Sequence, residues 1–271
     1  MGNASLVHLC QADDAISCGA CCGLYNVANL SRDHLETLLL NRTLLFEQTP
    51  RTAEDIDDFG RRIKSLTPRG RPYKEFHHCP FLGLVGENRQ KAGCLLHPLS
   101  NGNENTDWRG LSWYGAFACR TYFCPSHHKL PDSYKLIVRA AAEHWYLYGL
   151  VITETDFLES FFKQVEYILG RKLMENDAVL TREGRKAVGD FLDLKLNWPF
   201  RRKNSPLAHY FFGDGLYAPP EIIYPGPKGP APVFDAIFRA LHSEFKSESE
   251  VRQASDIVGT LAWDFAKSLC G

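Results

Sequence analysis

The chain has 271 residues, of which 44% are hydrophobic, and its formal net charge at pH 7 is -1. This length and composition allow one large domain or two small ones with a buried core. Because the net charge is close to zero, it gives no reason to expect binding to nucleic acid or to an anionic membrane. A local basic patch is left open, but we expect neither nucleic acid nor a membrane as a partner.

Cysteine is the residue type that stands out, with nine in the chain. The number is odd, and it is small for a disulfide-held fold of this size. Polar residues from His8 to Asp14 interrupt the start of the chain, which does not have the pattern of a signal peptide. The most apolar window, residues 136–153, contains Arg139, Glu143 and His144 and is not a membrane span. We expect a soluble, cytoplasmic protein whose reduced thiols are available to metals.

The first element in chain order is the stretch Cys18-Gly19-Ala20-Cys21-Cys22-Gly23, which places three thiols within five residues. Thiolates are ligands for zinc, copper(I) and iron-sulfur clusters, and a C-x-x-C step lets two sulfurs converge on one centre. The glycines permit the tight turn that this convergence needs. Adjacent side chains point in different directions, so of Cys21 and Cys22 one is expected to face a metal and the other a neighbouring metal, a cluster atom or the core.

Two helices are predicted next, near residues 31–46 and from Thr52 to Leu66. Ser31 is the expected N-cap of the first helix. Thr52 and Asp55 form a capping-box pattern at the start of the second, and apolar residues then recur at helical spacing. The Pro- and Gly-containing segment from residue 68 ends this helix.

Residues 79–125 lack periodicity and are rich in Gly, Asn and Pro, so irregular chain is predicted there. More cysteines lie in this segment, in three pieces: His77-His78-Cys79-Pro80, Cys94-Leu95-Leu96-His97 and Cys119-Arg120-Thr121-Tyr122-Phe123-Cys124-Pro125. Irregular chain needs another source of order, and a structural zinc site contributes on the order of 10 kcal/mol to folding. We therefore predict that the order of this segment depends on metal.

The second half of the chain is predicted to be helical, at about residues 136–150, 153–169, 181–196, 233–245 and 248–269. Capping patterns begin the second helix of this set at Thr153 and the last at Ser247, and Gly170 ends the second. The loop-rich stretch 199–232 is expected to fold over so that its aromatic residues are buried, and these are Tyr210, Phe211, Phe212 and Tyr217. The fold class that follows is mainly α, with an irregular cysteine-rich metal-bound half at 1–135 and a helical half at 136–271.

Seven cysteines are the candidate metal ligands, and they are Cys18, Cys21, Cys22, Cys79, Cys94, Cys119 and Cys124. Taken singly, each is equally well explained as a small buried hydrophobe. Their grouping beside Gly, Pro and His favours ligation over chance burial. Cys10 is a further candidate, Cys270 has no visible partner, and no catalytic residue is assigned.

The order of these pieces resembles the YkgJ-type family, which is described as a zinc- or iron-chelating domain. The resemblance covers the first half of the chain through Cys18-Gly19-Ala20-Cys21-Cys22, Cys79-Pro80-Phe81-Leu82, Cys94-Leu95-Leu96-His97 and Cys119-Arg120-Thr121-Tyr122-Phe123-Cys124. The sequence departs from the family pattern at two places near the candidate ligands. Ala15 occupies the position of a further cysteine in the family, and Gly115-Ala116 occupies the position of an Arg-Pro pair. The resemblance implies metal binding, and some relatives resemble flagellin lysine N-methylases that carry an iron-sulfur centre.

The residues alone do not decide whether the metal centre is an iron-sulfur cluster or zinc. Zinc needs four ligands, so seven thiols with His97 suffice for two sites. A four-iron (4Fe-4S) cluster also needs four cysteines, and the resemblance favours this cofactor. For His77, His78 and His97 the sequence does not distinguish a metal ligand from an orienting group or a solvated side chain. Arg120, beside Cys119, either compensates thiolate charge or is a surface arginine.

Three functions are consistent with these features. The first is a metal-binding protein whose helical half docks a protein partner or substrate. The second is an enzyme similar to protein lysine N-methyltransferases, although no Gly-rich nucleotide-type turn is present. The third is a structural zinc module for protein interaction.

Overall fold

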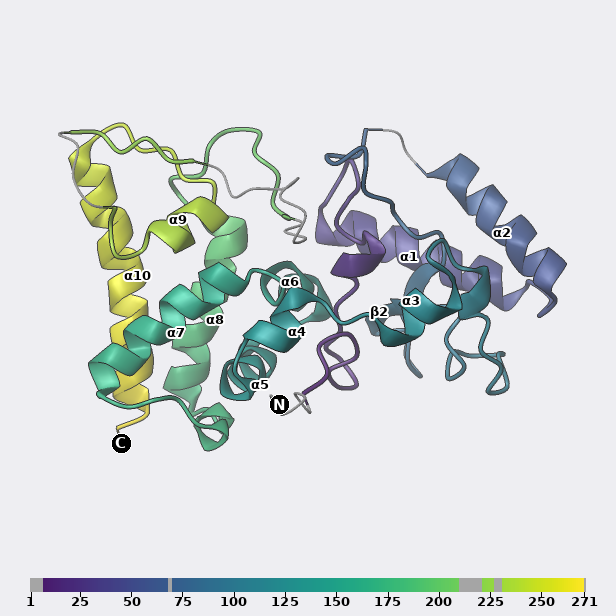
Figure 1. The fold of residues 1–271 in the computed structure, drawn as a ribbon, viewed down its shortest axis with the longest axis horizontal. Helices are drawn as coiled ribbons and strands as arrows, with labels where there is room; N and C mark the ends of the chain where they lie inside the picture. Colours follow the sequence, from purple (N-terminus) through teal and green to yellow (C-terminus); the bar gives the residue numbers. More distant parts are fainter. Residues whose placement is uncertain (1–6, 68–69, 210–220, 227–230, 271) are drawn as a thin grey trace. The chain divides into compact units, whose positions relative to one another are not determined.

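The computed structural model describes residues 7–67, 70–209, 221–226 and 231–270. In this part the protein is mainly α-helical, as the sequence predicts (Figure 1). The chain divides into two compact units. The cysteine unit comprises residues 9–124 and 144–149, and the helical unit comprises residues 125–143 and 150–271 with the first eight residues. The boundary expected after residue 135 thus differs from this division, because it falls inside helix α5, Asp132–Ala141, of the helical unit.

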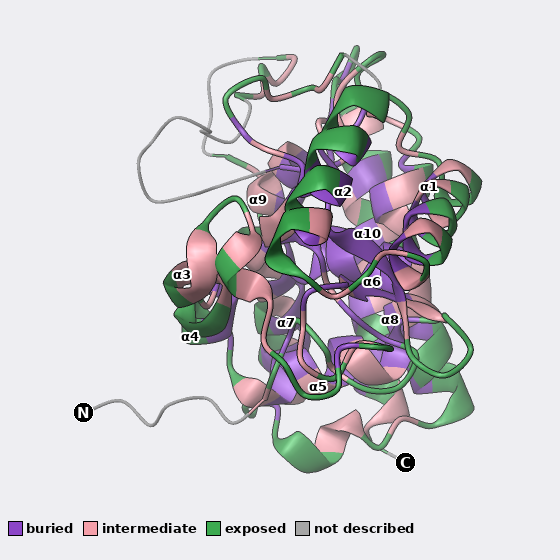
Figure 2. Cartoon of the chain, turned by 90° about the vertical axis from the view of Figure 1, so that its right-hand side faces the viewer, coloured by how far each residue is buried: buried purple, intermediate pink, exposed green. Residues whose placement is uncertain are grey.

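The cysteine unit is built from two helices, a two-stranded sheet and a short third helix. These are α1 Arg32–Glu47, α2 Ala53–Leu66, β1 Leu82–Val85, β2 Lys91–Cys94 and α3 Gly115–Thr121, with 3-10 turns at Ala20–Cys22 and Arg109–Leu111. Helix α1 packs on β1. Helix α2 buries Ile56, Phe59 and Ile63 on one face and exposes most of its remaining residues (Figure 2).

Strands β1 and β2 form an antiparallel pair that the sequence does not predict. Each has four residues, and glycines in both remove the alternation that identifies a strand. Thr43 of α1 holds the pair, because its Oγ1 accepts from Leu84 N at 2.8 Å and donates to Leu84 O at 2.9 Å. A Cβ on Gly83 would lie 2.6 Å from Thr43 Oγ1, so this close approach requires glycine.

The helical unit packs three long helices around an aromatic core. Its elements are α4 Pro125–Lys129, α5 Asp132–Ala141, α7 Thr155–Leu169, α8 Arg182–Asn197, α9 Asp235–Ala240 and α10 Glu248–Ser268. Helices α7 and α8 both pack against α10 (Figure 1). The rings of Phe161 and Phe191 stack with centroids 3.7 Å apart, and Phe157 stacks on Phe191 at 4.4 Å. None of the helices in the described ranges has the length and apolar character needed to cross a bilayer.

Three predicted helix ends are confirmed by their hydrogen bonds or backbone conformation, whereas Ser31 precedes α1 as predicted but makes no side-chain capping bond. Thr52 accepts from Asp55 N at 3.2 Å, and Ser247 accepts from Glu250 N at 3.3 Å. Gly170 ends α7 in the left-handed conformation at φ +67°. The cap predicted at Thr153 is wrong, because α7 begins at Thr155 and its N-cap position is Glu154, whose carboxylate makes no capping bond.

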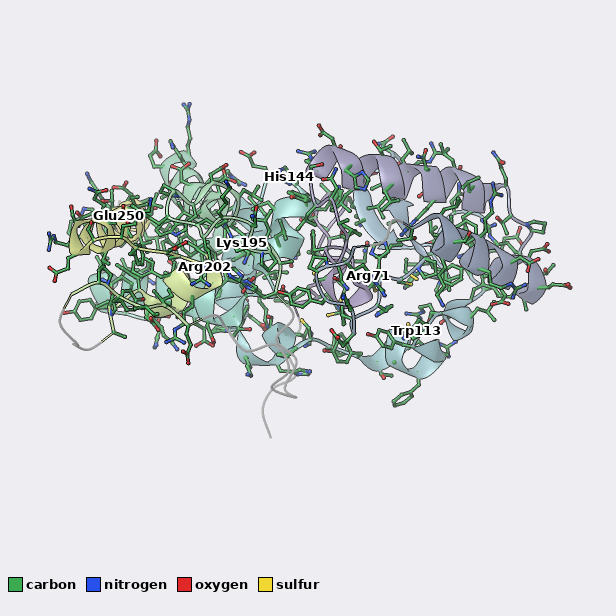
Figure 3. All side chains as sticks on the ribbon, turned by 90° about the horizontal axis from the view of Figure 1, so that it is seen from above. Arg71, Trp113, His144, Lys195, Arg202 and Glu250 are labelled. Carbon is green, nitrogen blue, oxygen red and sulfur yellow. The ribbon has the colours of Figure 1, made fainter. Side chains whose placement is uncertain are left out.

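Two predicted helices are shorter in the structure. The helix expected at 136–150 is divided into α5 and α6, Trp145–Val151, since His144 Nδ1 accepts from Leu147 N at 3.2 Å and begins a new helix. His144 is labelled in Figure 3. The helix expected at 233–245 is only α9, which ends before His242, whose φ is +52°. The aromatic residues expected to be buried at 210–212 and 217 lie outside the described residues.

Candidate metal centre

Backbone hydrogen bonds bring three cysteines of the cysteine unit together, although 72 positions separate the first from the last. Cys79 N donates to Cys22 O at 2.9 Å. Cys79 then leads into β1, and Leu82 of that strand pairs directly with Cys94 of β2. Cys22, Cys79 and Cys94 therefore lie around the start of the hairpin.

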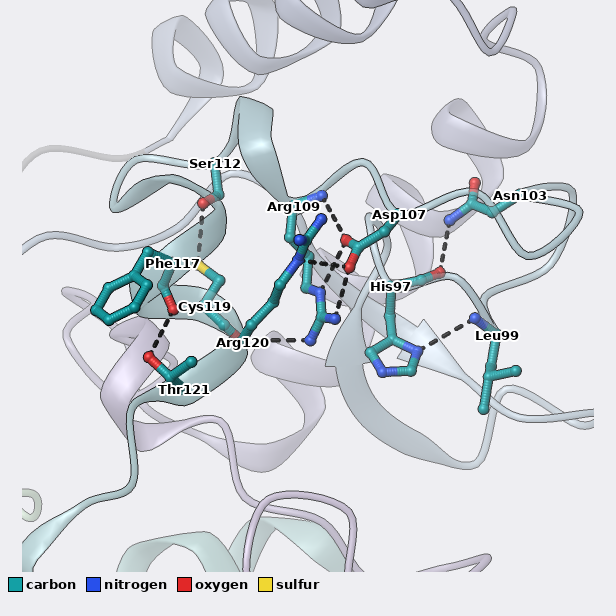
Figure 4. Close-up of polar contacts among 10 residues, drawn as sticks. All are labelled: His97, Leu99, Asn103, Asp107, Arg109, Ser112, Phe117, Cys119, Arg120 and Thr121. Atoms are coloured by element: carbon teal, nitrogen blue, oxygen red, sulfur yellow. Dashed lines mark hydrogen bonds and ion pairs between the residues drawn. The ribbon is translucent and has the colours of Figure 1, made fainter.

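Cys119 joins these three through the loop that follows the hairpin. Its Sγ lies 2.9 Å from Ser112 Oγ, and its carbonyl oxygen accepts from Arg109 Nη1 at 3.4 Å (Figure 4). Burial raises the pKa of Cys22, and the charges of Cys79, Cys94, Cys10 and Cys119 raise it further. Cys119 also acts on Cys79 and Cys94, so these three are within electrostatic range of one another. We call Cys22, Cys79, Cys94 and Cys119 the first thiol set.

Four other cysteines form a second thiol set, defined as Cys10, Cys18, Cys21 and Cys124. Cys18 N donates to Cys10 O at 3.0 Å. The Cys21 and Cys124 side chains are hydrogen-bonded to each other, and this bond is the main cause of the raised pKa of Cys21. Cys10 and Cys124 also raise the pKa of Cys18. Cys10, which the sequence leaves as a candidate, is therefore placed with three of the predicted ligands.

The adjacent residues Cys21 and Cys22 belong to different sets. The thiols that act on Cys21 are Cys124, Cys18 and Cys10. Those that act on Cys22 are, in decreasing order, Cys79 and Cys94 of the first set, Cys10 of the second set, and Cys119 of the first. The two sets are thus neighbours joined at one peptide bond.

Burial keeps the thiols of Cys79 and Cys94 protonated near neutral pH. It raises the pKa of Cys79 to about 11 and that of Cys94 to about 12. Within the described ranges, no group of three or more His, Cys, Asp or Glu side chains is placed so that it could hold a metal ion. Each set therefore brings sulfur donors into one region without forming a coordination site.

A buried arginine provides a test of whether metal-bound thiolates fit this unit. Arg42 of α1 is 2% exposed. Its Nη1 donates to Cys79 O at 3.3 Å and contacts His78 Nε2 at 2.8 Å, while its Nε has no hydrogen-bond partner among the described residues. No carboxylate in the described part pairs with it. A buried cation requires a compensating anion, and thiolates at Cys79 and its neighbours meet that requirement.

His78 and Gly23 hold the backbone beside the first thiol set. His78 Nδ1 lies 2.7 Å from Gly23 O, which can only accept, so Nδ1 carries the proton and Nε2 accepts from Arg42. Both ring nitrogens are therefore used, and His78 orients the chain instead of binding metal. Gly23 has φ +77°, and a Cβ there would lie 2.0 Å from His77 O, so the glycine after Cys22 is required by this approach.

The other residues singled out by the sequence have different surroundings. His97 Nδ1 accepts from Leu99 N at 3.2 Å (Figure 4), and the His77 ring packs edge-on against Tyr114 with centroids 4.3 Å apart. Arg120 is half-exposed and pairs with Asp107 at 2.8 Å. Arg109 is the arginine on which the charges of Cys94 and Cys119 act. Cys270 is exposed.

The helical unit contains a second polar cluster that the sequence does not indicate. Lys195 of α8 is fully buried and donates to Glu154 and, at 3.0 Å, to Ala240 O. His209 Nδ1 lies 2.9 Å from Glu154 Oε1. His209 Nε2 faces His242 Nε2 within hydrogen-bonding distance. These four residues come from separate segments with no shared spacing, so no motif could have identified them.

Acid is expected to destabilise the helical unit through this cluster. Burial, with the charges of His209 and Lys195, lowers the pKa of His242 to about 3 from its ordinary value of 6.5. An unfolded chain takes up this proton below about pH 6.5 and the folded chain does not until about pH 3. The free energy of unfolding is therefore highest above 6.5 and falls as the pH decreases through that window. Because His242 is only partly buried, the slope should be under about 1 kcal/mol per pH unit.

Urea unfolding at about pH 7 and about pH 5, followed by circular dichroism, measures this loss. His242→Asn is the matched variant, since Asn tolerates a positive φ and does not titrate. It should show a smaller difference between the two pH values. An unchanged difference would assign the acid sensitivity to other groups.

Comparison with protein-family models, with curated proteins and with solved structures gives no match.

Proposed function

We propose that this protein binds metal in the cysteine unit, with each thiol set supplying the four ligands of one iron-sulfur cluster. The observation that supports this most directly is the sorting of eight of the nine cysteines into two sets of four. A four-iron (4Fe-4S) cluster takes four cysteine ligands. The resemblance to iron-chelating domains, noted from the order of the cysteine pieces, supports the same assignment.

Zinc is the second candidate for the same sites. A four-cysteine site is a common structural zinc site, and the step from Cys18 to Cys21 has the spacing found in such sites. Both candidates use the same ligands, so the difference between them is one of metal and not of residues. The helical unit is proposed to dock a protein partner or substrate.

The protein contributes charge, enclosure and backbone geometry to such a centre. Bound clusters supply one-electron chemistry, and their potential depends on net charge and solvent access. Arg42, which donates to Cys79 O, and Arg109, on which Cys94 and Cys119 act, supply positive charge to the first thiol set. The buried residues Leu24 and Phe81, 0% and 3% exposed, exclude water from the chain around Cys22 and Cys79.

Metal and acid-labile sulfide analysis after anaerobic purification tests the proposal. We expect a brown protein with about eight iron and about eight sulfide per chain. A colourless protein with about two zinc per chain and no sulfide would replace the clusters with structural zinc. Absence of both metals from protein purified and reconstituted under anaerobic conditions would contradict metal binding altogether.

A further inference from the structure

The polar cluster of the helical unit continues to an arginine whose donors are not used. Arg201 forms an isolated antiparallel bridge with Ser243, next to His242. The neighbouring Arg202 N donates to His242 O at 2.8 Å, which fixes this segment against the turn after α9. Lys195 and Arg202 are labelled in Figure 3. Arg201 therefore lies on the same part of the helical unit as the histidine pair.

Two nitrogens of the Arg201 guanidinium are buried without an acceptor. Its Nη2 donates to Lys195 O at 2.7 Å. Its Nε and Nη1 have no hydrogen-bond partner in the described part of the chain. A charged donor that is buried without an acceptor is strongly unfavourable, so an acceptor from outside the described residues is required.

Within the described ranges, the carboxylate that acts on this cluster is already occupied. Glu154 accepts from Lys195 and His209, and its charge also acts on Arg201. Among the described residues, Glu154 is also the only acidic group whose charge acts on Lys195, His209 and Arg201. Two permanent cations against one carboxylate leave an excess of one positive charge.

The histidine pair of His209 and His242 lies beside this excess positive charge. Two facing imidazoles with a carboxylate behind one of them resemble a metal-binding arrangement. However, burial and then the charges of His209, Lys195 and Arg201 lower the pKa of His242, so this region disfavours a further cation. The His209 Nδ1 proton is directed at Glu154, so in the neutral pair His242 Nε2 donates to His209 Nε2.

His242 is also held in an unusual backbone conformation. Its φ of +52° is uncommon for a residue with a side chain. Such conformations are kept where the surrounding structure imposes them, often at binding sites. Here the turn directs the imidazole at His209, beside the bridge between Arg201 and Ser243.

We propose that the helical unit binds a small oxyanion, the carboxylate or phosphate group of a small molecule, at the unused donors of Arg201 beside His242. The anion neutralises the excess positive charge and accepts from Arg201 Nε and Nη1. Arginine is well suited to both oxyanions because its donors are fixed in one plane. This site is independent of the thiol sets and of the metal that they bind.

Calorimetric titration of the full chain with sodium phosphate and, separately, with sodium acetate tests this site. We expect saturable binding of at least one of the two, and the better ligand identifies the chemical source of the oxyanion. Arg201→Gln should weaken that binding about tenfold or more, because a charge-assisted pair is removed. His242→Asn, which suits the turn, should weaken it to a smaller extent.

Arg202→Gln is the matched control, since this neighbouring arginine is exposed and offers the same charge to solvent. It should leave the affinity unchanged. Circular dichroism and the unfolding transition establish that each variant is folded. The proposal is overturned if neither anion binds the folded wild-type chain, which means that water satisfies Arg201, or if Arg201→Gln and Arg202→Gln behave alike.

Discussion

Replacing Cys21 with serine should remove one metal centre of the protein, and replacing the adjacent Cys22 should remove the other. The thiols around Cys21 are Cys10, Cys18 and Cys124, whereas Cys22 is grouped with cysteines of the hairpin and α3. Serine keeps the size of the side chain and removes the soft thiolate ligand. Each single variant is therefore expected to hold about half of the wild-type metal.

The double variant distinguishes two centres from one. If the adjacent cysteines serve separate centres, the double variant should hold almost no metal. If they serve a single centre, its metal content should equal that of either single variant, and the two-set assignment is wrong. Cys270→Ser is the control, since that thiol is exposed and outside both sets. Metal and sulfide per chain are the quantities to compare.

Removing the metal should unfold the cysteine unit while the helical unit stays folded. Between residues 79 and 124 the regular structure is limited to two four-residue strands, a single 3-10 turn and the short helix α3. Ligand bonds of a structural metal site contribute on the order of 10 kcal/mol to folding, which is comparable to the whole stability of a domain. The metal-free unit should therefore lose its native structure.

Hydrogen exchange on the protein before and after chelation measures this effect region by region. Amides of β1, β2 and the turn at Ala20–Cys22 should lose protection. Amides of α7, α8 and α10 are the internal control, because their core of stacked phenylalanines contains no proposed ligand. Full protection of the hairpin after complete metal removal would mean that packing of α1 on β1 is sufficient for folding.

Local patterns predicted the helices well and failed where the structure depends on distant residues. The caps at Thr52 and Ser247 were predicted because a capping side chain and the backbone N–H that donates to it lie within three residues of each other. The hairpin was not, because its glycine-containing strands are stabilised by Thr43, about 40 positions away. The break at His144 was hidden because apolar residues predominate on both sides of it, from Leu136 to Val151.

The candidate site shows the same division. The cysteine pieces indicated which thiols cluster, but not that they sort into two sets, since the sorting depends on the contact between Cys79 and Cys22. Cys10 lies outside the C-x-x-C pattern and reaches the second set through its backbone bond with Cys18. Arg42 looks like any polar residue of a helix in the sequence, and only burial reveals it as a countercharge.

The cysteine unit is interrupted along the chain, and this has a consequence for its synthesis. Residues 144–149 belong to it although residues 125–143 do not. Tyr25 Oη, in the buried interior, donates to Tyr146 O at 3.0 Å, and Tyr146 Oη donates to Leu30 O at 2.6 Å. Domains fold on the ribosome as their last residues emerge. After Cys124, the last cysteine of the two sets, at least 25 further residues must therefore be synthesised before the unit is complete. During that interval the thiols are exposed to metals and oxidants.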